Sequence, residues 1–114
     1  ESDEPFETRV LETVQKRLQN LWDGAGVLCL SDYDKGLAGC GVFEKAVRAA
    51  HQNGLCVSGG PKPLNMGCFA NADFLSLNQK EASEAAGLKL DSDVAVEAAG
   101  EALRRQSGAR ALVI

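Results

Sequence analysis

The sequence predicts an α/β fold with three layers, in which a mostly parallel sheet lies between helices on both faces. Short apolar runs alternate with longer segments whose apolar residues recur at helical spacing. The short runs are too uniformly apolar for strands with one face in water, which is typical of parallel strands covered on both sides. Right-handed crossovers between them are therefore expected.

Proline and glycine mark the ends of the predicted helices. Pro5 suits a first helical turn, and Gly24, Gly54 and Gly87 each follow the last apolar position of a helix. The expected helices cover residues 5–22, 41–53, 78–86 and 92–103, with one helical turn at 66–71. The expected strands cover residues 26–30, 55–58, 73–77 and 111–114. No internal repeat or linker interrupts this order.

Composition limits the class of protein. A chain of 114 residues is one domain or part of one, and 45% apolar with 25% charged residues is typical of a folded soluble protein. No segment approaches the length of a membrane span, and the acidic start at residues 1–4 is unlike a signal peptide. A net charge of −4 with scattered arginines argues against nucleic acid. We therefore expect a cytoplasmic protein with no membrane or nucleic-acid partner.

The cysteines and the single histidine do not indicate a metal centre. Cys29 and Cys56 lie inside apolar strand runs and are expected to be small buried residues, whereas Cys40 and Cys68 are expected to be partly exposed. The cysteines lack C-x-x-C spacing, and His51 is expected on the solvated face of a helix. Neither a zinc site nor a cysteine nucleophile is predicted.

Polar residues gather where the predicted strands end. Residues 31–36 (SDYDKG) and 78–81 (NQKE) each follow an apolar run and lead into a helix, and the loop at 59–63 opens on the same edge. In a parallel sheet, ligands bind outside the carboxyl ends of the strands, where loops and helix N-termini converge. Each of these three stretches carries one lysine, in the same order Lys35, Lys80 and Lys62. These lysines either form a positive patch for an anionic ligand or are simply solvated.

Each candidate residue has a functional and a structural interpretation. Asp32 can orient a sugar hydroxyl, and Lys35 or Lys62 can meet a phosphate, or the same residues form ordinary turns with solvated lysines. Asn78 and Glu81 have the spacing of a capping box, in which each side chain accepts from the other residue's backbone. The same amide and carboxylate can organise water around Mg²⁺. These two interpretations are compatible.

Together these motifs resemble the carbohydrate kinases of the ribokinase or PfkB family, most closely the heptose 7-phosphate kinase domains of ADP-heptose synthases. That group has a strand ending in Ser-Asp-Tyr-x-Lys-Gly, as at residues 31–36, and later strands leading to Asp-Pro-Lys and Thr-Pro-Asn-x-x-Glu. This chain has Gly-Pro-Lys at 60–62 and Ser-Leu-Asn at 76–78, so one carboxylate is missing. The resemblance implies that residues 1–114 are the central part of a single ribokinase-like domain, truncated at both ends.

The resemblance also implies an activity. A kinase of this kind transfers a phosphoryl group from ATP to a sugar with Mg²⁺, here expected at O1 of a heptose 7-phosphate. Asp32, Lys35 and Lys62 would bind the phosphorylated sugar, and Asn78 and Glu81 would bind the nucleotide and Mg²⁺ through water. The Gly-Ala-Gly-Asp motif with its catalytic aspartate is expected beyond Ile114, so no catalytic residue is assigned. We therefore expect the isolated chain to be inactive and to self-associate through its truncated faces.

A receiver-like regulatory module, with Asp32 as phosphoacceptor, is the alternative function. Receiver chemistry needs a further acidic pair at the end of an earlier strand, and the first predicted element here is a helix. The sequence also contains neither a Walker motif nor G-x-G-x-x-G. The kinase interpretation is therefore preferred.

Overall fold

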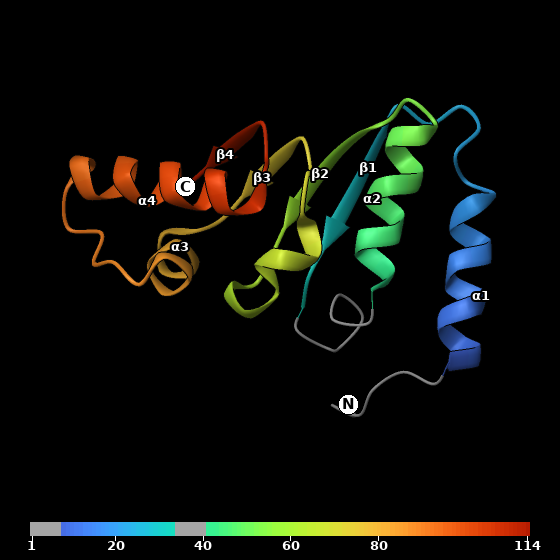
Figure 1. Cartoon of the computed structure of the whole chain (residues 1–114), viewed down its shortest axis with the longest axis horizontal. Coiled ribbons are helices and arrows are strands. Elements are labelled where there is room, and N and C mark those ends of the chain that lie inside the picture. The colour runs from blue at the N-terminus through green and yellow to red at the C-terminus, as the bar shows by residue number, and fades with distance from the viewer. Residues whose placement is uncertain (1–7, 34–40) are drawn as a thin grey trace.

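The computed structural model describes residues 8–33 and 41–114, which form a parallel sheet with helices packed against it (Figure 1). The order of elements confirms the predicted alternation, and the helical turn expected at 66–71 is a 3-10 helix. The elements are α1 (Thr8–Gln19), β1 (Val27–Ser31), α2 (Val42–Gln52), β2 (Cys56–Gly60), η2 (Pro63–Phe69), β3 (Phe74–Ser76), α3 (Gln79–Ala86), α4 (Asp93–Ser107) and β4 (Ala111–Val113).

The strands lie in the order β1-β2-β3-β4, and every neighbouring pair is parallel. In this register Ser31 lies opposite Gly60, and Leu75 lies opposite both Gly59 and Leu112. Because the strands run in the same direction, their carboxyl ends share one edge of the sheet. The predicted α/β class with a parallel sheet is thus confirmed, and the polar loops that follow β1, β2 and β3 are brought to that edge.

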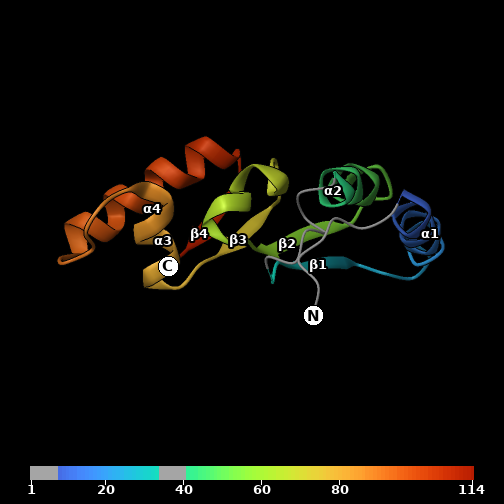
Figure 2. The same cartoon turned by 90° about the horizontal axis from the view of Figure 1, so that it is seen from below.

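In the described residues, the helices cover one face of the sheet, whereas helices on both faces were expected. Figure 2 shows α2, η2 and α4 on the same side of the strands, with α1 packed beside α2. The sequential strand order explains this arrangement. When each new strand is added on the same side of the previous one, crossovers of one hand carry every connecting helix over the same face.

The other face of the sheet is open and carries no charged side chain in these strands. Val27, Phe74 and Val113 point to this side and are 57%, 39% and 49% exposed. Cys29 and Cys56 are exposed there as well, so their predicted burial is wrong. The apolar runs were interpreted as covered on both faces, but alternate residues in each strand face solvent. The expected self-association through truncated faces of the chain stays a prediction.

The core lies between the sheet and the helices and is centred on two phenylalanines. The Phe43 ring on α2 meets the Phe69 ring of η2 edge to face, with centroids 5.3 Å apart. Phe69 also lies over Gly59 of β2, where an added Cβ would come within 2.7 Å of the ring atom Cε1. A glycine at this position therefore allows η2 to sit directly on the strand.

At the amino-terminal edge of the sheet, Asp73 joins three elements. Its Oδ2 accepts hydrogen bonds from the Val57 amide, 2.7 Å away, and contacts His51 Nε2 of α2 at 2.8 Å. Its own amide donates to Val57 O and its carbonyl accepts from Ala111. His51 lies on an exposed helix surface as predicted. Its contact with Asp73 gives it a structural role that the sequence did not indicate.

Candidate functional site

The carboxyl edge of the sheet brings together four of the five residues predicted to form a site. Asp32 directly follows β1, Lys62 follows β2 by two residues, and Asn78 and Glu81 begin α3 after β3. Three hydrogen bonds link them. The Lys62 amide donates to Asp32, the Lys62 ammonium donates to Glu81, and the Asn78 amide also donates to Glu81. The fifth residue, Lys35, lies outside the described residues.

Asp32 holds the loop that follows β2. Its amide donates to Gly60 O, which extends the pairing of β1 and β2 by one residue. Its side-chain Oδ2 accepts from the Lys62 amide at 3.0 Å and from Asn65 Nδ2 at 2.8 Å. The residue is only 7% exposed. Burial of a carboxylate is tolerated here because donors from the loop satisfy it.

Lys62 and Glu81 form an ion pair across the edge, with Nζ and Oε2 3.0 Å apart. The pKa of Lys62 is raised, chiefly by its hydrogen bond to Glu81 and also by the negative charge of that carboxylate. The pKa of Glu81 is lowered, first by the backbone amide of Asn78 and then by Lys62. Both groups therefore stay charged at neutral pH, and the lysine side chain remains 41% exposed.

Asn78 and Glu81 form a complete capping box at the start of α3. Asn78 Oδ1 accepts from the Glu81 amide at 2.8 Å, and Glu81 Oε1 accepts from the Asn78 amide at 3.0 Å. The structural interpretation of this motif is confirmed. Because Glu81 uses its other oxygen for Lys62, the same residue both begins the helix and holds a cation at the edge.

Replacing Glu81 separates its two roles. We expect Glu81→Ala to lower the free energy of unfolding by about 1 kcal/mol, because it removes the capping box. Glu81→Gln should retain most of that stability, since glutamine also completes a capping box, while it removes the charge beside Lys62. Equilibrium urea unfolding measures both changes.

Glu84→Ala is the matched control for these variants, because Glu84 is an exposed glutamate on the same helix. Its expected effect is below about 0.5 kcal/mol. Equal losses for Glu84→Ala and Glu81→Ala would show that the capping box does not stabilise α3.

The side-chain oxygens of Asn78 and Glu81 suit a divalent cation that keeps its water shell rather than one that they coordinate directly. Across residues 8–33 and 41–114, no group of three or more histidine, cysteine, aspartate or glutamate side chains is placed to hold a metal. Asn78 Oδ1 and both Glu81 oxygens already accept hydrogen bonds. Mg²⁺ commonly retains several waters, and those waters can donate to the remaining lone pairs of these oxygens.

A wide hollow adjoins the edge between η2 and α3. It has a volume of about 580 Å³ and is lined by Lys62, Pro63, Leu64, Glu84 and Ala85. Leu64 is 85% exposed on its rim. A small molecule at this place would meet the Lys62 ammonium from solvent. Sequence reasoning did not single out this hollow, because it is formed by segments about twenty residues apart.

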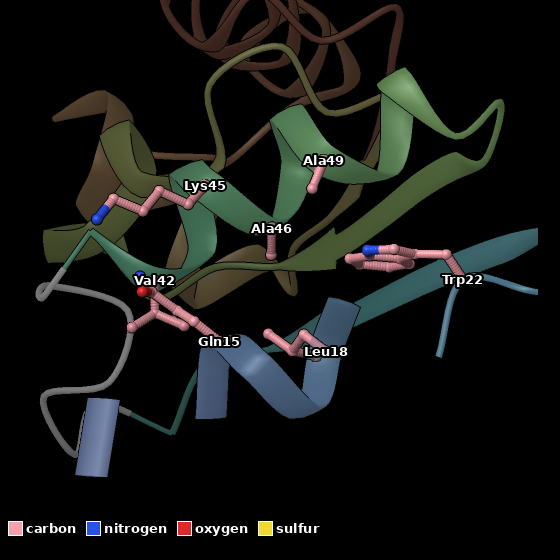
Figure 3. A pocket seen from close by; sticks show the side chains of 7 residues that line it. All are labelled: Gln15, Leu18, Trp22, Val42, Lys45, Ala46 and Ala49. Atoms are coloured by element: carbon pink, nitrogen blue, oxygen red, sulfur yellow. The ribbon is translucent and has the colours of Figure 1, made fainter. Parts of the chain in front are cut away.

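A second, smaller cavity lies between α1 and α2 and is mainly apolar. Its volume is about 90 Å³, and Figure 3 shows Leu18 and Trp22 facing the alanines of α2 across it. Its lining residues are Gln15, Leu18, Trp22, Val42, Lys45, Ala46 and Ala49. None of the predicted site residues lines it. This cavity therefore arises from imperfect packing between two helices and is not part of the site at the carboxyl edge of the sheet.

Asn65 is a site residue that the sequence analysis missed. Its side-chain amide donates to Asp32, and it follows Lys62 by three residues in the first turn of η2. The available signal was its place in the loop stiffened by Pro61 and Pro63. The aspartate that it contacts is 33 residues away in the sequence, so this contact could be predicted only from the arrangement of the parallel strands.

The arrangement can hold an anion and a hydrated cation side by side. Lys62 supplies a protonated ammonium on a loop fixed by Asp32, and Glu81 and Asn78 supply oxygen acceptors beside it, with Glu81 Oε2 3.0 Å from that ammonium. Among the described residues, no helix is long and apolar enough to cross a bilayer.

Comparison with known proteins gives relatives by sequence and by structure. No protein-family model matches the chain. The bifunctional protein HldE of Paramagnetospirillum magneticum is 32% identical over 114 residues, which is 100% of this chain and 23% of that protein. HldE of Azorhizobium caulinodans is 36% identical over 89 residues, 78% of this chain and 19% of that protein. The chain thus spans less than a quarter of the curated relatives that it matches.

Solved structures of phosphofructokinase-2 from Escherichia coli share the fold. One mutant form superposes with a TM-score of 0.75 over 96% of this chain and 36% of that chain, at 16% identity. The complex of that enzyme with fructose-6-phosphate gives a TM-score of 0.70, at 16% identity over 96% of this chain and 37% of that chain. These superpositions confirm the predicted ribokinase-like fold.

Proposed function

This chain is a PfkB-like segment related to the bifunctional proteins HldE, and we propose that it is part of an ATP-dependent sugar kinase. We propose a heptose 7-phosphate as the substrate, phosphorylated at O1 in the synthesis of ADP-heptose in the cytoplasm. The observation that carries the proposal is the meeting of Lys62, Glu81 and Asn78 at the carboxyl edge of the parallel sheet. This is the edge where α/β proteins bind phosphorylated ligands.

In the proposed reaction, the residues of this segment position the substrates and balance their charge. Lys62 binds a phosphate oxygen with its ammonium, which stays protonated beside Glu81. The family resemblance assigns Asp32 and Lys35 to the same substrate and phosphate region. Asn78 and Glu81 would hold Mg²⁺ through its water molecules, and the ion would supply positive charge that neutralises the nucleotide phosphates. Phosphoryl transfer depends mainly on positioning and charge, so these roles match the chemistry.

The sequence contains no Gly-Ala-Gly-Asp motif, so we propose that the 114-residue chain binds substrate without turning it over. In a coupled ADP-release assay with ATP, Mg²⁺ and heptose 7-phosphate, we expect no rate above the blank. A measurable rate from the purified chain would overturn the proposed inactivity.

Calorimetric titration with heptose 7-phosphate tests binding separately from turnover. Lys62→Met should weaken binding about tenfold or more, since it removes a charge-assisted hydrogen bond. Lys80→Met is the matched control, because Lys80 is an exposed lysine on the first turn of α3. Equal affinity of the wild type and Lys62→Met would contradict the proposed role of this lysine.

The receiver-like alternative is not favoured by any observation on the described residues. A phosphoacceptor aspartate must be reached by a phosphodonor, whereas Asp32 is 7% exposed and its Oδ2 accepts two hydrogen bonds from the following loop.

A further inference from the structure

Asp32 is the buried residue at the carboxyl edge of the sheet, and its Oδ2 contacts the loop that carries Lys62. We infer that Asp32 is a positioning residue: it fixes the loop at 61–65 so that the Lys62 ammonium is presented to ligand, and Asn65 is the second point of the same attachment. This inference rests on the proposed function, because it assigns how one residue of that site acts on another.

The geometry gives the loop two points of attachment to one carboxylate oxygen. Asp32 Oδ2 accepts from the backbone of Lys62 and from the side chain of Asn65, three residues later. A single hydrogen bond would leave the loop able to rotate about it, whereas two donors on one acceptor define its orientation. Lys62 itself has extended backbone angles, as expected for a residue that precedes a proline. Its side chain reaches α3, where Nζ lies 3.0 Å from Glu81 Oε2.

Burial separates the role of Asp32 from that of Lys62. Asp32 is 7% exposed, while the Lys62 side chain is 41% exposed and faces the hollow beside η2. A ligand in that hollow can reach the ammonium without any rearrangement. It can reach Asp32 Oδ2 only by displacing the Lys62 amide or the Asn65 side chain. The carboxylate is therefore better placed to act through Lys62 than to touch the ligand.

Competitive acetylation of lysines, read by mass spectrometry, tests this positioning. An ammonium held by a carboxylate is acetylated slowly, so the ratio of Lys62 to Lys80 labelling reports on the Lys62–Glu81 pair. Asp32→Ala should raise this ratio about two- to fivefold, the equivalent of one partly exposed ion pair. Asp32→Asn retains an oxygen acceptor for the loop and should restore a ratio close to that of the wild type.

Asp73→Ala is the control for general destabilisation. Asp73 also accepts a backbone amide and a side-chain group, but it lies at the opposite edge of the sheet. Under conditions where all variants are folded, Asp73→Ala should leave the ratio unchanged. If Asp32→Ala also leaves it unchanged, or if Asp73→Ala raises it equally, Asp32 does not position Lys62.

The same labelling with added heptose 7-phosphate distinguishes this inference from the proposed function. Protection of Lys62 by the sugar phosphate in the wild type, and its loss in Asp32→Ala, supports both. If heptose 7-phosphate gives no protection in the wild type while Asp32→Ala still raises the ratio, the positioning role stands and the proposed kinase function loses its support at this lysine.

Discussion

Phe69→Ala is expected to lower the free energy of unfolding by about 3–5 kcal/mol, the largest loss anticipated for any single change in this chain. Phe69 is fully buried between the sheet and α2, where it contacts the Phe43 ring edge to face. Domains of this size have a total stability of about 5–15 kcal/mol, so the variant should be close to unfolding at room temperature. Denaturant unfolding followed by circular dichroism measures the change.

Phe74→Ala is the matched control, because this substitution removes the same kind of ring from the open face of the sheet, where Phe74 is 39% exposed. We expect it to cost less than about 1 kcal/mol. Similar losses for the two variants would show that the core is not centred on Phe69.

Gly59 supplies a second check on the same contact. Gly59→Ala should cost about 1–3 kcal/mol, because its new methyl group would press against the buried ring of Phe69 and the side chain of Leu75. In the Phe69→Ala background most of that cost should disappear, as the ring that it meets is gone. Additive losses in this double-mutant cycle would indicate that the glycine is needed for another reason.

The order of elements could be predicted because local signals agreed along the chain. Ser92 caps α4 by accepting from the Ala95 amide, and Gly87 ends α3 with a positive φ, as its place after the last apolar position predicted. These are short-range features that one segment of sequence carries by itself. The parallel sheet followed from the alternation of elements.

The number of layers could not be predicted from the same signals. An apolar run such as 27–30 indicates a strand with apolar residues on both sides, but it does not say whether both sides are covered within the chain. Here the sequential strand order places the helices on one face, and Cys29 remains exposed on the other.

The position of the site at the carboxyl edge of the sheet could be predicted, but the contacts between its side chains could not. Strand ends identified Asp32, Lys62 and Asn78, because parallel strands bring their ends together. The contacts of Asp32 with Asn65 and of Lys62 with Glu81 join residues 33 and 19 positions apart. Such pairs depend on how far η2 turns after β2, which the sequence pattern does not determine.

Asp73→Ala, like Gly59→Ala, is expected to lower the free energy of unfolding by about 1–3 kcal/mol at neutral pH, because it leaves the buried amide of Val57 without its acceptor. The pKa of Asp73 is lowered, first by that amide and then by His51. A carboxyl group whose pKa is lower in the folded state stabilises the protein above its unfolded pKa, near 3.8. This stabilisation is then lost as the pH falls through the folded value.

Asp73→Asn should therefore flatten the fall in stability as the pH drops below about 5, since asparagine keeps an acceptor but cannot titrate. Urea unfolding at a series of pH values measures this slope. Asp91→Asn, at an exposed position between α3 and α4, serves as the control and should keep the slope of the wild type. If Asp73→Asn also keeps that slope, the charge of Asp73 does not hold α2, β2 and β3 together. The amide of Val57 would then need only a neutral acceptor, and the acid sensitivity of the fold would have to come from other carboxyl groups whose pKa is lowered, such as Glu81 and Glu101.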